Sequence, residues 1–184
     1  AALYTETCQV VVRADSEIRT VEDLQGKTVS IGAEESGSEQ NAMQILSAYG
    51  LNDKLVSMVN LNYEDAEAQL KAGKIDAVFI TAGAPSPVLA ELAGECGIRL
   101  LNVDGAAAQR LISTYSAYSM VTLPAGTYSG QTEDVQTVGV KAVLLASDEL
   151  PAKQVQKLTE LLFSSREGLE EQLGIPLDAE QDAV

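Results

Sequence analysis

The stretch Lys27-Thr-Val-Ser-Ile-Gly-Ala-Glu-Glu-Ser-Gly-Ser-Glu-Gln-Asn-Ala-Met-Gln-Ile-Leu46 contains the transition that decides the fold. Its first part, Lys27 to Ile31, is short and rich in β-branched residues, which is typical of a short strand. From Ala42 to Tyr49 apolar residues recur at helical spacing, and Gly50 follows as a stop signal. The stretch therefore predicts a strand followed directly by an amphipathic helix.

The same alternation of strand and helix repeats along the first two thirds of the chain. We expect strands at residues 8–13, 27–31, 55–61, 76–80 and 98–103, and helices at residues 21–25, 42–49, 63–72, 87–95 and 106–112, the last capped by Asp104. Such alternation implies right-handed βαβ units. The predicted fold class is α/β, with a mostly parallel five-stranded sheet and helices on both faces.

The last third of the chain has a different pattern. A short strand at residues 119–123 and a long β-rich run at residues 135–146 precede helices at about residues 151–162 and 166–174. The apolar stripe of the first of these helices has no obvious sheet of its own within the chain. The sequence therefore indicates C-terminal elements that complete another domain.

Composition excludes several functional classes. The chain of 184 residues has 12 Lys and Arg against 27 Asp and Glu, which gives 12 − 27 = −15, and no basic cluster interrupts this excess. Binding to a nucleic-acid backbone is therefore not expected. No apolar run reaches the roughly 18 residues of a membrane span. We find no His, the usual general base, and the spacing of Cys8 and Cys96 indicates two buried thiols rather than a metal site.

The first candidate binding site is the loop Ser36-Gly37-Ser38. Ser36 and Glu39 satisfy a capping box, so the loop has a purely structural explanation as a helix start. However, it follows the carboxyl end of a strand, where open parallel sheets bind ligands on free helix NH groups. The adjacent Glu34 and Glu35 would repel a phosphate dianion, and a P-loop signature is absent.

The second candidate is the loop Thr81-Ala82-Gly83, which follows the strand at residues 76–80. A tight strand-to-helix turn explains its small residues, and the functional alternative is that it lies beside Ser36 and Ser38 at one edge of the sheet. The tyrosine-rich segment 115–128 is interpreted as a cover for the sheet.

Several motifs in order resemble one known family over nearly the whole chain. They are Leu3-Tyr4-x-Glu6, Val10 to Arg13, Val21-x-Asp23-Leu24-x-Gly26-Lys27, Ser36-Gly37-Ser38-Glu39-x-Asn41-Ala42, Asp76 to Phe79, Thr81-Ala82-Gly83-x-Pro85 and Thr137 to Ala142. Together they resemble the solute receptors of TRAP transporters of the TAXI type.

This resemblance implies a fold, a partner and a location. It implies a periplasmic-binding-protein fold of type II, in which two α/β domains close over a small solute that a membrane permease then carries. Residues 5–135 would form the second, ligand-binding domain, and residues 136–184 would be the crossover strand and helices that complete the first. Since family receptors are longer at the N-terminus, we expect this chain to be a fragment. The full-length protein would be periplasmic or extracytoplasmic, and a lipoprotein anchor is compatible with this.

The resemblance also implies site residues and a ligand class. Ser36, Gly37 and Ser38 match the first cleft loop, Thr81, Ala82 and Gly83 match the second, and Tyr4 matches an aromatic residue near the crossing strand. Glu35, together with Glu34, departs from the smaller or neutral residues of the family, which favours an amino acid or another zwitterion over a plain anion. The expected function is capture of a glutamate-like or related solute without catalysis, metal or cofactor. The alternatives are the metabolite-sensing domain of a transcriptional regulator and an enzyme on the same fold.

Overall fold

The computed structural model describes residues 2–173 and residue 177. The chain divides into two compact units, one made of residues 6–140 and the other combining residues 1–5 with residues 141–184. The sequence had placed the boundary between residues 135 and 136.

The order of elements along the chain follows the expected alternation. The elements are β1 (Ala2–Arg13), the 3-10 helix η1 (Glu22–Leu24), β2 (Thr28–Ser30), α1 (Gly37–Ala48), β3 (Ser57–Val59), α2 (Tyr63–Lys71), β4 (Ala77–Ala82), α3 (Pro87–Glu95), β5 (Ile98–Leu101), α4 (Gly105–Thr114), β6 (Tyr118–Leu123), β7 (Val135–Val143), α5 (Ala152–Ser164) and α6 (Arg166–Leu173). Gly174, the last residue of the final predicted helix, lies outside the described residues.

The sheet has the strand order β3-β2-β4-β1-β7-β6, and β5 also pairs with β1. Strand β2 is parallel to β3 and β4, as the βαβ pattern requires. Strand β1 is antiparallel to β4 and β5, and β6 is antiparallel to β7. The predicted α/β class with a helix-flanked sheet is confirmed.

The expected number of five strands is wrong, because the described residues form a sheet of seven strands. The two additional strands are β6 and β7, which pair with each other as a hairpin between Tyr118 and Val140. The sequence pattern indicated that both segments are β-rich. However, no two-residue turn connects them, and such a turn would have indicated that they pair and extend the same sheet.

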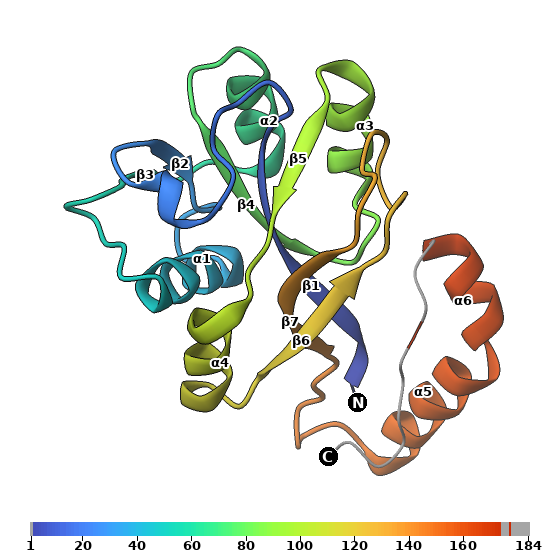
Figure 1. Cartoon of the computed structure of the whole chain (residues 1–184). Coiled ribbons are helices and arrows are strands. Elements are labelled where there is room, and N and C mark those ends of the chain that lie inside the picture. The colour runs from blue at the N-terminus through green and yellow to red at the C-terminus, as the bar shows by residue number, and fades with distance from the viewer. Residues whose placement is uncertain (1, 174–176, 178–184) are drawn as a thin grey trace. The chain divides into compact units, whose positions relative to one another are not determined.

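Helices cover both faces of the sheet in residues 6–140, with α1 and α4 on one face and α2 and α3 on the other (Figure 1). The pleat of β4 explains how one strand serves both cores. Ala77 and Phe79 join the core under α1 and α4, whereas Val78 and Ile80 join the core under α2 and α3. The strand is therefore apolar on both sides, as a central strand must be.

Three local expectations are corrected by the structure. Asp104 occupies the N-cap position of α4, but its side chain makes no capping hydrogen bond. Cys8 is buried, whereas Cys96 is only partly buried, because it lies at the C-terminal end of α3 just before Gly97 turns the chain with φ at +70°. The capping box at α1 is also altered and is described below.

The unit that combines residues 1–5 with residues 141–184 contains α5 and α6. Helix α5 has no buried residue, and Leu158 and Leu161 of its apolar stripe are 56% and 51% exposed. The interpretation of these helices as part of another domain stays a prediction.

A search of the helices among the described residues found none with both the length and the apolar character that a bilayer crossing requires.

Candidate functional site

Two polar loops lie at the carboxyl edge of the parallel part of the sheet. Ser36 to Ser38 follow β2, Thr81 and Ala82 end β4, and β2 and β4 are adjacent parallel strands in the register Ser30 to Val78. This is the edge at which α/β sheets bind ligands. The sequence expectation that the two loops lie near each other is thus supported by strand order.

The first loop begins helix α1. The Oγ of Ser36 accepts a hydrogen bond from the main-chain N of Glu39 at 3.1 Å, as a capping residue should. The carboxylate of Glu39 does not return to Ser36 as the capping box predicts. It accepts from the main-chain N of Glu35 at 2.7 Å instead, because Glu35 has a left-handed φ of 60° that presents its NH to Glu39.

The cap leaves two donors unused at the start of α1. Within the described part of the chain, the main-chain NH groups of Gly37 and Ser38 have no hydrogen-bond acceptor. A Cβ added to Gly37 would meet nothing within 4 Å. These NH groups are therefore left for water or a ligand, and the helix dipole favours negative charge at this end of the helix.

Tyr63, the first residue of α2, joins the two loops. Its hydroxyl lies 2.6 Å from Ser38 Oγ, donates to the main-chain O of Thr81 at 2.9 Å, and accepts from the N of Thr81 at 3.2 Å. Because the single tyrosine proton is directed at the Thr81 carbonyl, Ser38 must donate its own proton to Tyr63. The Ser38 oxygen therefore offers a ligand lone pairs and no proton.

Asn41 fixes the side chain of Thr81 from the α1 side. Its Nδ2 donates to Thr81 Oγ1 at 3.3 Å, and Thr81 Oγ1 donates to the Sγ of Cys8 at 3.6 Å. Burial raises the pKa of the Cys8 thiol to about 11, so this sulfur stays protonated and acts as a weak acceptor. Like Ser38, Thr81 therefore has only lone pairs left for a ligand.

Tyr118, from β6, completes the cluster beneath α1. Its hydroxyl lies 2.7 Å from Asn41 Oδ1 and 2.7 Å from Gln44 Oε1. One hydroxyl proton cannot serve both oxygens, so the Gln44 amide must present its NH₂ group to Tyr118, which makes the network self-consistent. Burial raises the pKa of Tyr118, so the phenol stays protonated.

Sequence reasoning identified the two loops but missed the residues that join them. Tyr63, Asn41 and Tyr118 come from three different elements, and only Asn41 lies in a quoted motif. The sequence did contain a signal for Tyr63. It is an aromatic residue at the start of a helix that follows a strand, and such a position lies at the same edge of the sheet as the two loops.

The remaining predicted residues have less defined roles. Glu35 is exposed and contributes its main-chain NH to Glu39, Ala82 pairs with Thr7 in the sheet, and Gly83 is partly exposed. Tyr4 lies on β1 in the other compact unit. In the residues that the structure describes, no group of three or more His, Cys, Asp or Glu side chains is placed to hold a metal ion.

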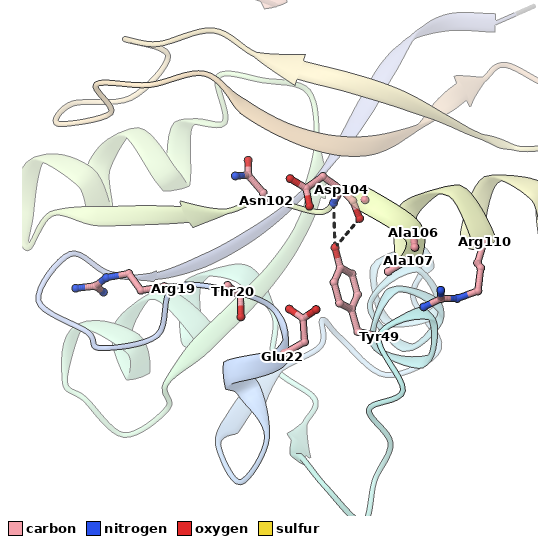
Figure 2. Close-up of a pocket in the computed structure, with 10 residues that line it drawn as sticks. Arg19, Thr20, Glu22, Tyr49, Asn102, Asp104, Ala106, Ala107 and Arg110 are labelled. Carbon is pink, nitrogen blue, oxygen red and sulfur yellow. Dashed lines mark hydrogen bonds between the residues drawn. The ribbon is translucent and has the colours of Figure 1, made fainter.

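A separate pocket of about 380 Å³ lies at the opposite end of α1, roughly 18 Å along a helix of 12 residues. Figure 2 shows Tyr49 in its wall, with the hydroxyl directed at the main chain of Asp104. The Tyr49 hydroxyl accepts a hydrogen bond from the main-chain N of Asp104 at 2.9 Å. Burial raises the pKa of the Tyr49 phenol. Arg110 donates to the main-chain O of Ala48 at 2.6 Å, so its guanidinium group binds a carbonyl at the C-terminal end of α1. The start of α4 also lines this pocket, and its N-cap Asp104 makes no side-chain capping bond.

The fold defined above is that of the periplasmic solute-binding proteins. The chain matches the periplasmic aliphatic sulphonate binding protein SsuA from Escherichia coli with a TM-score of 0.52 and 20% identity, over 92% of this chain and 48% of SsuA. It matches an ancestral arginine-binding protein bound to arginine with a TM-score of 0.50 and 17% identity, over 92% of this chain and 60% of that protein. The chain thus spans about half to three fifths of these structures.

A family model described as the NMT1-like family matches residues 1–183. The chain belongs to the NMT1-like family.

Proposed function

We propose that this chain is the solute-binding receptor subunit of a TRAP transporter of the TAXI type and captures a small amino acid or organic acid for import. The family membership and the fold shared with periplasmic solute-binding proteins support this class of function. In the proposal the receptor releases its solute unchanged to the membrane permease, and it is not an enzyme. It acts in the periplasm or outside the membrane, with a lipoprotein anchor as one means of attachment.

One observation carries the proposal. The NH groups of Gly37 and Ser38 have no acceptor within the described residues, and the tyrosine hydroxyl of Tyr63 holds Ser38 against the second loop. Unsatisfied NH groups at a helix start suit a carboxylate. Water meets such NH groups at any exposed helix start, so it is the position of this pair beside the second loop, at the ligand-binding edge of the sheet, that favours a solute here.

The hydrogen-bond directions favour a zwitterion. Donors come from the main chain at Gly37 and Ser38, whereas Ser38 Oγ and Thr81 Oγ1 retain lone pairs that an ammonium group can use. The exposed carboxylates of Glu34 and Glu35 and the net charge of −15 disfavour a dianion. The proposed solute therefore carries one carboxylate for the helix start and one amine for the hydroxyl oxygens.

The test is a thermal-shift screen with L-glutamate, L-glutamine, L-arginine and succinate. At a hundredfold excess over Kd, a bound solute stabilises the protein by about 2.7 kcal/mol, which corresponds to a Tm increase of roughly 5–10 °C. We expect an amino acid to produce this increase and succinate to produce a smaller one.

Two glycine variants make the screen specific to the site. A Cβ at Gly37 meets nothing within 4 Å, so Gly37→Leu should leave the unliganded Tm within about 3 °C and abolish the solute-induced shift, because the side chain fills the space before the NH groups. Gly94→Leu is the matched control, since Gly94 is also helical and equally open but lies in α3. A full shift in Gly37→Leu would remove this loop from the site, and no shift with any compound would contradict solute capture.

A further inference from the structure

The loop from Thr81 to Ser86 is anchored by a tyrosine hydroxyl at each end. Tyr63 holds the N and O of Thr81 at 3.2 and 2.9 Å, and the hydroxyl of Tyr128 accepts from the N of Ser86 at 2.8 Å. Between these anchors lie Ala82 to Pro85, which include two of the residues predicted to face the solute. The two tyrosines come from α2 and from the segment after β6, so they approach the loop from unrelated parts of the chain.

The Tyr128 anchor continues into the sheet through Gln9. The Tyr128 hydroxyl donates to Gln9 Oε1 at 2.6 Å, and both residues are buried, with 3% and 1% of their surfaces exposed. Because Tyr128 accepts from Ser86 and must place its own proton on an acceptor, the Gln9 amide is oriented with its oxygen toward Tyr128. Its Nε2 is then left buried with no hydrogen-bond partner among the described residues.

An unpartnered buried amide is unfavourable for the folded state. Leu or Met at position 9 would fill a β1 site beside Ile80 without this penalty. Buried residues that break the usual rules of core packing are expected mainly at functional sites. Gln9 is most simply explained as the acceptor that fixes the Tyr128 hydroxyl and, through it, the end of the loop.

We infer that Tyr63, Tyr128 and Gln9 are positioning residues that set the geometry of the second solute-binding loop, with Gln9 acting through Tyr128. This inference rests on the proposed function of the loop and adds residues that do not touch the solute. Rigid loops raise affinity because less conformational freedom is lost on binding. The loop is thus fixed at both ends before a solute arrives.

The experiment measures amide hydrogen exchange by NMR in residues 1–184 without solute, comparing Thr81 and Ser86, whose amides donate to the two tyrosine hydroxyls, with the amides of β4 before Thr81. Tyr128→Phe and Tyr63→Phe each remove one hydroxyl, and we expect exchange to accelerate at least tenfold at both loop ends, including the end that keeps its tyrosine, while the earlier amides of β4 change less than threefold. Tyr115→Phe is the control, because Tyr115 is 42% exposed and belongs to neither anchor. Loop exchange unchanged from wild type, or accelerated only in step with β4, would overturn the inference.

A double variant separates positioning from stability. Gln9→Met combined with Tyr128→Phe removes the buried unpartnered amide together with the hydroxyl that used its oxygen. We expect its Tm to equal or exceed that of Tyr128→Phe alone, with loop exchange as fast as in the single variant. A lower Tm together with restored slow exchange would show that Gln9 serves core stability and would overturn its assignment.

L-glutamate is the binding probe in the same set of proteins. If wild type binds it, Tyr128→Phe should raise Kd about tenfold and Tyr115→Phe should leave Kd unchanged; equal affinity in wild type and Tyr128→Phe would overturn the inference. Failure of wild type to bind counts against the proposed solute, while the exchange measurement still decides the positioning role.

Discussion

The hydroxyl oxygen of Tyr63 lies 2.6 Å from Ser38 Oγ and also bonds both main-chain polar atoms of Thr81. One side chain thereby connects the two loops that follow neighbouring parallel strands. Tyr63→Phe should lower the free energy of unfolding by about 1–3 kcal/mol, because it removes hydrogen bonds in a partly buried site. Urea unfolding measures this loss, and Tyr115→Phe should stay within about 0.5 kcal/mol of wild type. Equal stability of the two variants would contradict the linking role of Tyr63.

Gly32 allows the first loop to approach the sheet. It has φ at +99°, and an added Cβ would lie 2.9 Å from the Cβ of Ser38. Gly32→Ala should therefore cost about 2–4 kcal/mol, as backbone strain and overpacking add together. Gly50→Ala is the matched comparison, because Gly50 has φ at +75° in open space and should cost only about 1 kcal/mol. Chemical denaturation of both variants tests the difference, and equal losses would mean that the contact with Ser38 is unimportant.

The sequence predicted most elements of the sheet and both candidate loops, because strands and helices alternate with clear periodicity and the loops follow strands. It did not predict that β6 and β7 extend the sheet, since the 11 residues between Leu123 and Val135 carry no short-turn signal. The joining role of Tyr63 was also missed, because it depends on contacts 18 and 25 residues away in the chain. Periodicity reports local structure, whereas hydrogen bonds between loops are set by strand order.

The helix cap at Ser36 should contribute measurably to stability. Ser36→Ala removes the acceptor for the N of Glu39 and should cost about 1 kcal/mol. Ser86→Ala is a useful comparison, because Ser86 is the N-cap of α3 but makes no capping bond through its side chain. It should cost less than Ser36→Ala in the same urea titration, and the reverse order would contradict the capping role of Ser36.

The two thiols should differ in reactivity and in their effect on stability at high pH. Burial raises the pKa of Cys8 from 9.0 to about 11, so the folded state holds its proton where the unfolded state loses it. Stability from this group is therefore complete below about pH 9 and is lost as the pH rises to about 11. At pH 8 a thiol reagent should label the partly buried Cys96 first and Cys8 only on unfolding. Cys8→Ala should flatten the stability decline between these pH values; rapid labelling of both thiols in the folded protein would contradict the assignment.

The most direct test of solute capture at the helix start is a ¹H–¹⁵N NMR titration of residues 1–184 with L-glutamate and the other amino acids of the screen. We predict saturable chemical-shift changes at the amides of Gly37 and Ser38, with smaller changes at Gly83 and none at Gly94. Substitution of Gly37 by Leu should abolish these changes. Saturable changes confined to the pocket around Tyr49, or no saturable change with any amino acid, would contradict a solute site between the two loops.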